Sequence, residues 1–154
     1  MSVQLEGRLA NPDRKARADF CPIERTFNVV GTRSAMLLLR EAAYGTTRFD
    51  DFVRRAGLTE TVASSRLREL VDAALLTKQP YREPGQRTRY EYVLTAAGAD
   101  LVPTLVALAA WGAEHLPHQP SPSFAHAGCG APVTTRIECA AGHVVTMDEL
   151  VASA

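Results

Sequence analysis

Four residues near the C-terminal end of the chain have the types and the spacing of metal ligands. His126 and Cys129 form one close pair, Cys139 and His143 form a second, and nine residues separate the two pairs. Two thiols and two imidazoles in this arrangement are typical of a closed, structural tetrahedral zinc site. A zinc ion would also explain how so short a tail keeps its shape, because the tail has little core of its own. The alternative is an ordinary β-hairpin with two reduced cysteines, docked on the rest of the protein.

The third cysteine, Cys21, directly precedes Pro22 at the expected start of a helix. The N–H groups at a helix N-terminus favour a thiolate, and Arg25 one turn later would add to this effect. Cys21 is therefore a candidate thiol sensor for an oxidant or another effector. A quiet cysteine packed at a subunit interface is the alternative. The odd number of cysteines argues against a disulfide framework.

A third group of residues could contact nucleic acid. In the segment 59–74, small and apolar residues recur at helical spacing on one face, and polar residues occupy the other. Small polar side chains and arginines on such an outer face can reach base edges and phosphates, and basic residues of a following hairpin can reach the backbone or the minor groove. The alternative is a solvated helix face with surface ion pairs. The candidate DNA contacts are Arg48, Thr59, Thr61, Val62, Ser65, Arg68, Arg82, Arg87 and Arg89.

The elements that must position these residues form a mostly helical fold with a small β-hairpin. The apolar periodicity predicts helices, and Gly and Pro signals predict the turns between them. A short helix, a tight turn and a second helix followed by a hairpin form a winged helix-turn-helix. The predicted helices are 22–30, 32–45, a third that opens at Thr46-Thr47 and ends at Gly57, 59–74, and 95–116; the hairpin, or wing, is 77–94 with its turn at 84–87.

The predicted helix 95–116 is apolar on more than one face, which requires cover on several sides. The domain before it is too small to cover it, so we expect a second copy of the chain to do so. Pro103 lies early in this helix and is expected to kink it. The candidate dimer contacts are Ile23, Phe27, Leu101, Leu105, Leu108 and Trp111.

The length of 154 residues suits one domain with a small appendage. We expect a flexible arm at 1–19, the winged-helix and dimerisation domain at 20–116, a Pro-rich linker at 117–125, and a tail at 126–154. Within the tail, 133–137 and 143–146 are expected strands. The net charge is zero, but the stretch from Arg33 to Arg89 holds eleven basic and seven acidic residues, which indicates an anionic partner.

No apolar run reaches the roughly 20 residues that cross a bilayer, and residues 1–19 are unlike a signal peptide, so we expect a cytoplasmic protein with no membrane partner. The chain also lacks a Gly-rich phosphate loop, the H-E-x-x-H and G-x-S-x-G motifs and a C-x-x-C pair. These absences favour a protein that is not an enzyme.

Several short motifs together resemble the HxlR family of bacterial winged-helix regulators. The resemblance covers about residues 20–116 and implies a winged helix whose terminal helices form a homodimer that represses or activates neighbouring genes. It also implies that Cys21 stands at the position where several members of the family sense oxidants or electrophiles. One departure is Arg33-Ser34, where the family usually has Trp-Thr. The matching motifs are Cys21-Pro22, Gly31, 37–41 (LLLRE), 48–52 (RFDDF), 65–70 (SRLREL), Leu75-Leu76, 90–95 (YEYVLT), 98–101 (GADL) and Trp111-Gly112.

The function predicted from the sequence is that of a homodimeric DNA-binding transcriptional regulator. It would bind a pseudo-palindromic operator through the helix 59–74 and the wing 77–94, under the control of a thiol switch at Cys21 or a small-molecule effector. The alternative is a protein-interaction module that keeps the winged-helix shape without binding specific DNA.

Overall fold

The computed structural model describes residues 2–13, 21–116 and 122–154. The chain divides into two compact units. One is Asp19–Ala109, and the other combines Met1–Ala18 with Ala110–Ala154.

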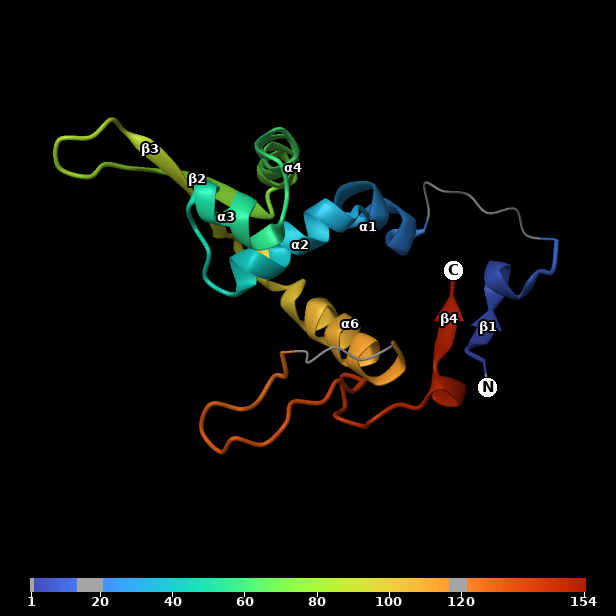
Figure 1. Ribbon diagram of the computed structural model, residues 1–154. Helices are drawn as coiled ribbons and strands as arrows, with labels where there is room; N and C mark the ends of the chain where they lie inside the picture. Colours follow the sequence, from blue (N-terminus) through green and yellow to red (C-terminus); the bar gives the residue numbers. More distant parts are fainter. Residues whose placement is uncertain (1, 14–20, 117–121) are drawn as a thin grey trace. The chain divides into compact units, whose positions relative to one another are not determined.

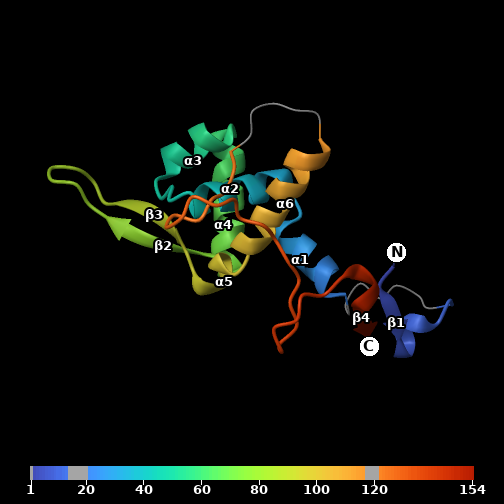
Figure 2. The ribbon, with the colours of Figure 1, turned by 90° about the horizontal axis from the view of Figure 1, so that it is seen from below.

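The unit Asp19–Ala109 is a winged helix: four helices, then a two-stranded antiparallel hairpin that projects from them (Figures 1 and 2). This confirms the mostly helical fold with a small sheet. In the hairpin, Leu76 lies opposite Leu94 at one end and Tyr81 lies opposite Arg89 at the other. The elements are α1 (Pro22–Val30), α2 (Arg33–Ala43), α3 (Phe49–Ala56), α4 (Glu60–Asp72), β2 (Leu76–Tyr81), β3 (Arg89–Leu94), α5 (Ala96–Ala99) and the first part of α6 (Val102–His115).

Threonines begin three of the helices. The hydroxyl oxygens of Thr32, Thr59 and Thr95 each accept a hydrogen bond from the backbone N–H three residues later, at 3.2, 3.3 and 3.0 Å. Each bond satisfies one of the N–H groups that the first turn of a helix leaves without a partner. Thr32 and Thr59, which open the predicted helices 32–45 and 59–74, are the N-caps of α2 and α4. The helix α3 starts later than predicted, at Phe49, because Thr46 is buried and Thr47 is bonded to β3.

One apolar core holds the helices and the wing together. Phe52 of α3 is fully buried and meets the ring of Tyr92 of β3 edge-on, with the ring centroids 6.2 Å apart. Burial raises the pKa of the Tyr92 phenol. The backbone N–H of Tyr92 also donates to the carbonyl of Thr47 at 2.8 Å, so the wing is tied to the segment before α3. The buried core residues are Val30, Ala35, Leu38, Leu39, Ala42, Phe52, Ala56, Leu67, Leu70 and Leu76.

The predicted helix 95–116 is broken into α5 and α6 at Asp100–Leu101. Pro103 explains the break, because its ring clashes with the carbonyl four residues earlier and it offers no N–H. By length and composition the stretch Ala96–His115 would pass as a membrane span, with mean hydropathy 1.4 and 6% of it buried. Two of these apolar residues, Leu101 and Leu105, pack on the core of the helical unit.

The second unit contains a short parallel pair of strands from the two ends of the chain. β1 (Gln4–Glu6) pairs with β4 (Val151–Ser153), and one-turn 3-10 helices, η1 (Gly7–Ala10) and η3 (Met147–Glu149), flank them. Instead of an arm without regular structure, the described residues 2–13 therefore hold a strand, which was not predicted because three residues show no usable periodicity.

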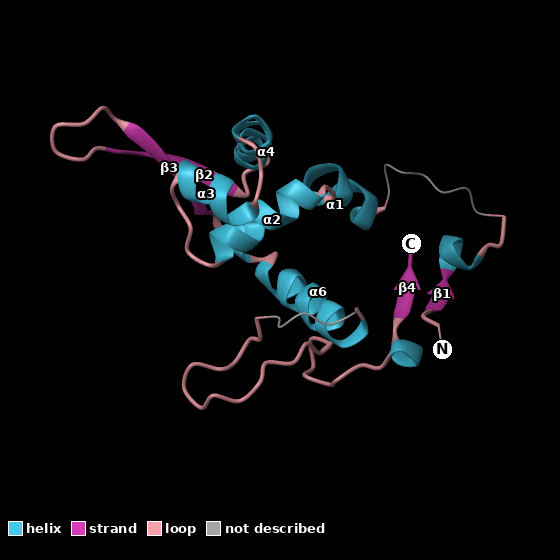
Figure 3. Cartoon of the chain, viewed as in Figure 1, coloured by secondary structure: helices cyan, strands magenta, loops and turns pink. Residues whose placement is uncertain are grey.

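The tail is mostly loop between residues 122 and 146 (Figure 3). The predicted strands at 133–137 and 143–146 are wrong. The structure has only two isolated bridges there, Ala125 with Pro132 and Glu138 with Val144. The linker 117–125 falls mainly on residues 117–121, which lie outside the described residues.

Candidate nucleic-acid interface

The helix-turn-helix places α4 with one face inward and one face outward. α3 ends at Gly57, and Thr59 caps α4 two residues later. The inward residues Ala63, Leu67 and Leu70 are buried as predicted. α4 contacts α2 and α3 through this face, so the opposite face is fixed in direction by the core. Ala74 ends the predicted helix 59–74, but it lies past the end of α4 and is exposed with a positive φ of 56°.

The outward face of α4 is exposed and polar. Thr61, Val62, Ser65 and Arg68 are all exposed, which is what contact with DNA requires of them. Ser65 donates to the Glu69 carboxylate at 3.1 Å. Among the described residues, Arg68 forms no ion pair, so its guanidinium is available to a phosphate or a guanine.

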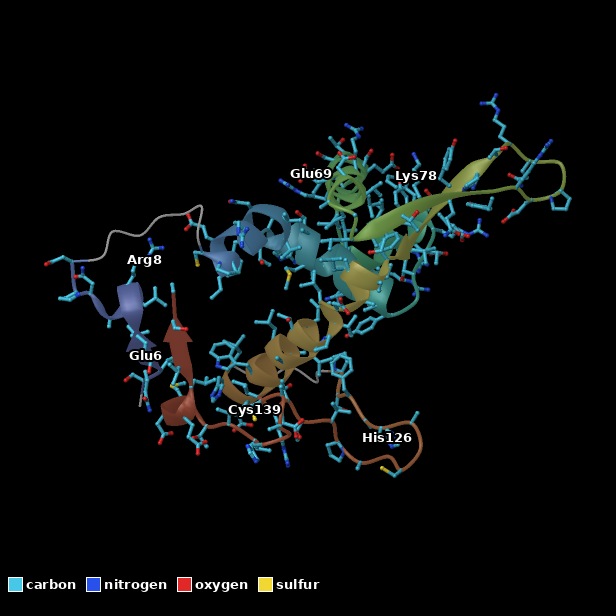
Figure 4. The ribbon with its side chains drawn as sticks, turned by 180° about the vertical axis from the view of Figure 1, so that it is seen from behind. Glu6, Arg8, Glu69, Lys78, His126 and Cys139 are labelled. Atoms are coloured by element: carbon cyan, nitrogen blue, oxygen red, sulfur yellow. The ribbon has the colours of Figure 1, made fainter. Side chains whose placement is uncertain are left out.

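Glu69 brings a negative charge to the same face. Its carboxylate accepts from Ser65 and pairs with Arg66, as helical spacing predicts. Arg66 is therefore engaged within the helix. Figure 4 shows Glu69 on α4 and Lys78 on the neighbouring wing strand.

The wing tip is basic and exposed. Residues 82–90 are all exposed, and they include Arg82, Arg87 and Arg89. Nε of Arg82 donates to the carbonyl of Gln86 at 3.2 Å, which holds the turn and leaves the charge at the surface. Among the described residues neither Arg87 nor Arg89 forms an ion pair.

Arg48 has partners within the protein that the sequence did not predict. It is the residue before α3, and its guanidinium carbon lies 3.3 Å from the ring centroid of Tyr81 on β2. Its Nη1 also pairs with Glu83 at 3.5 Å. Arg48 therefore joins the start of α3 to the wing near the outer end of β2, through Tyr81 and Glu83.

A second cation–aromatic contact lies beside the first and was not predicted. Nζ of Lys78 lies 4.3 Å from the ring centroid of Tyr90 on the facing strand. Together these groups line an open hollow of about 370 Å³ between the wing and the start of α3, which Phe49 and Asp50 also line. The sequence signal was the run of basic and aromatic residues that face each other across the hairpin.

Both arginines of α3 have partners within the protein. Arg54 bonds the carboxylate of Asp51, and this hydrogen bond, with Coulomb attraction to Arg54 and to other arginines, lowers the pKa of Asp51. Arg55 donates to the buried hydroxyl of Thr46 at 3.2 Å. Arg54 and Arg55 of α3 are therefore less available to a phosphate than a cation without a partner.

The candidate dimer contacts fall into two groups. Leu101 and Leu105 are partly buried on the chain's own core. Ile23 and Phe27 of α1 are 65% and 64% exposed, and Leu108 and Trp111 of α6 are 52% and 57% exposed. Large apolar side chains exposed to this extent on two helices are typical of surfaces that another protein covers.

Cys21 is an exposed free thiol immediately before α1, and Pro22 is the first residue of that helix as predicted. The carbonyl of Cys21 accepts from the N–H of Arg25, while its side chain caps no N–H group. The thiol is therefore open to a small electrophile.

The four metal-ligand candidates of the tail form two pairs. Nδ1 of His126 lies 3.3 Å from Sγ of Cys129, and Nδ1 of His143 lies 3.6 Å from Sγ of Cys139. The described residues contain no group of three or more metal-binding side chains, so the two pairs are separate. Backbone N–H groups of His143 and Ala141 lower the pKa of the Cys139 thiol.

Comparisons with known proteins find a helix-turn-helix family model and regulators of transcription. The HxlR-like helix-turn-helix family model matches residues 29–120. Rv3095 of Mycobacterium tuberculosis, named an HTH-type transcriptional regulator, is 37% identical over 133 residues, which cover 85% of this chain and 83% of the relative. Among solved structures, PA1607, assigned as a transcription factor, matches with a TM-score of 0.73 and 30% identity over 82% of this chain and 89% of its own. The redox regulator HypR in its reduced form matches with a TM-score of 0.55 and 27% identity, over 61% and 92% of the two chains.

Proposed function

Because the chain belongs to the HxlR-like helix-turn-helix family, whose curated relatives are transcriptional regulators, we propose that it controls transcription as a homodimer bound to a pseudo-palindromic operator. Regulators of this family are not enzymes, and a DNA-binding regulator acts where the chromosome is, in the cytoplasm. The operator, the dimer and the effector are the parts of this proposal that experiments must test.

The observation that carries the proposal is the outward face of α4. Four of the candidate contacts, Thr61, Val62, Ser65 and Arg68, are exposed on a helix whose opposite face is locked into the core. This is the arrangement that lets a recognition helix enter a major groove without loss of packing. The exposed Arg87 and Arg89 of the wing add cations that reach phosphates or the minor groove.

The homodimer is supported by the exposed apolar residues of the two terminal helices. Burying Phe27 and Trp111 against a second copy removes large aromatic surfaces from water, each of which stabilises an interface by about 1.5–3 kcal/mol. Two copies related by a two-fold axis present two α4 helices, and these match the two halves of a palindrome.

We propose Cys21 as the point of thiol control. It is exposed, lies at the start of α1, and that helix carries the exposed Ile23 and Phe27 of the proposed interface. Modification of Cys21 would therefore act on the packing of the two copies and on the distance between the two recognition helices. HypR, a redox regulator with a similar fold, supports this assignment.

The direct test is titration of the purified chain against its own upstream DNA and against random DNA of the same length, with and without an oxidant. We expect binding to the upstream region to exceed binding to random DNA by at least about 1,000-fold. An oxidant should change the specific affinity, and Cys21→Ser should abolish that change while keeping the reduced affinity.

The competing proposal is a winged-helix interaction module without specific DNA binding. Equal affinity for upstream and random DNA under every condition would favour it. An oxidant effect that persists in Cys21→Ser would refute the thiol assignment and leave DNA binding standing.

A further inference from the structure

The tail of the chain contains two turns that are each closed by the N–H of a glycine. In the first, the N–H of Gly130 donates to the carbonyl of His126 at 2.8 Å, and a bridge closes just outside it. In the second, the N–H of Gly142 donates to the carbonyl of Cys139 at 2.9 Å, and again a bridge closes outside. Gly130 and Gly142 both have positive φ, 70° and 82°, which other residues rarely adopt. Each turn presents one histidine and one cysteine.

The spacing of the side chains within each turn fits a tetrahedral metal ion. Zinc binds sulfur at about 2.3 Å and imidazole nitrogen at about 2.0 Å, so two such ligands at the tetrahedral angle are about 3.5 Å apart. The observed distances from Nδ1 to Sγ are 3.3 Å in the first turn and 3.6 Å in the second. Each pair can therefore supply two of the four ligands of a zinc ion with almost no movement of its own two side chains.

The tail has no apolar core that could fix its shape. None of the described residues 122–154 is buried, and Val133, Ile137, Val144 and Met147 are about half exposed. Segments of this size that lack a core are usually held by a metal or by disulfides. The pairing of each thiol with an imidazole favours the metal.

We propose that His126, Cys129, Cys139 and His143 bind one zinc ion in a closed tetrahedral site that draws the two turns together. Figure 4 shows His126 and Cys139 at separate turns of the tail. The connection between Cys129 and Cys139 has nine exposed residues, and the entropy cost of closing such a loop grows only slowly with its length.

The chemistry of the ligand set selects zinc. Two thiolates and two neutral imidazoles suit this borderline-soft ion, and they leave no open position for a substrate. Binding releases the protons of the two thiols and leaves a site with no net charge. The site is structural, and it would also protect Cys129 and Cys139 from oxidation, which leaves Cys21 as the reactive thiol of the chain.

The test is the metal content of the full chain, purified without a metal-affinity column and measured by mass spectrometry of the elements. We expect one zinc per chain. Cys129→Ser and His143→Ala should each lose it, while the matched control Cys21→Ser keeps it. Cobalt substituted into the chain should show the visible absorption of a tetrahedral ion and a thiolate charge-transfer band, and this band should weaken in Cys129→Ser.

Helical circular dichroism and DNA binding of the same variants separate this result from the proposed function, because both are properties of the unit Asp19–Ala109. A chain that copurifies with no zinc and takes up none from solution would overturn the proposal. So would full zinc content in Cys129→Ser, or half a zinc per chain, which would place the ion between two copies.

Discussion

Replacing Arg48 by Met should weaken the attachment of the wing to the helices. The guanidinium of Arg48 lies 3.3 Å from the ring centroid of Tyr81 and pairs with Glu83 at 3.5 Å. A cation–aromatic contact at an exposed site contributes about 0.5–1 kcal/mol. The ion pair adds only about 0–0.5 kcal/mol, because the Glu83 side chain is 57% exposed and solvent screens it. The expected loss of unfolding free energy is about 1 kcal/mol.

The assay is a double-mutant cycle of Arg48→Met and Tyr81→Leu, followed by urea unfolding at one protein concentration. We expect a coupling free energy of about 0.5–1 kcal/mol between the two side chains. The matched control is the Arg54–Asp51 pair, which has the same kind of cation without a ring and should show a weak but measurable coupling. If Arg48 and Tyr81 show no coupling free energy while the control pair shows a measurable one, Arg48 does not attach the wing through Tyr81.

The same cycle separates anchoring from direct DNA contact. If Arg48 anchors the wing, both single variants should lower DNA affinity to a similar extent, and the double variant should lose no further affinity. If Arg48 contacts a phosphate instead, the variant Arg48→Met should bind DNA with a log–log salt slope that is lower by about 0.9, and Tyr81→Leu should leave the slope unchanged.

Three further substitutions test the packing that positions α4 and the wing, each by urea unfolding. A Cβ at Gly98 would lie 2.1 Å from the carbonyl oxygen of Leu75, so Gly98→Ala should destabilise the chain by about 1–3 kcal/mol or more, and an unchanged midpoint would show that α5 does not pack there. Thr95 donates to the Ala74 carbonyl at 2.6 Å and caps α5, so Thr95→Ala should cost about 1–2 kcal/mol, with Thr95→Ser retaining most of it. Leu67→Ala should cost about 2–5 kcal/mol because Leu67 is fully buried, whereas the exposed Ser64→Ala should stay within about 0.5 kcal/mol.

Local signals were enough to predict the helices of the winged unit. The predicted helices 32–45 and 59–74 both open on a threonine, whose hydroxyl can satisfy the N–H groups of a helix start, and the structure shows Thr32 and Thr59 in this role. The inner face of α4 followed from helical spacing, since only one side of a helix can reach the core. The residues proposed for DNA contact on α4 lie on the face that this argument left outside.

The attachment of the wing to α3 and the pairing of the chain ends needed information that no local pattern holds. Arg48 looked like a free cation because its ring partner, Tyr81, lies across the fold. The pairing of β1 with β4 joins residues from opposite ends of the chain through three-residue strands, which are too short to show alternation. The predicted strands of the tail were wrong for a related reason. An alternating pattern predicts a strand only where one face is buried, and none of the residues 133–137 and 143–146 is buried.

The central claim, that α4 and the wing bind DNA, is tested most directly by a salt series of DNA titrations with the variant Arg68→Ala/Arg87→Ala/Arg89→Ala. We predict a specific affinity lower by at least about 10-fold and a log–log salt slope lower by about 0.9 for each phosphate contact removed. The control Arg33→Ala, which removes an exposed cation before the helix-turn-helix, should change neither. A triple variant that folds and binds with the affinity and the salt slope of the unaltered chain would contradict the account.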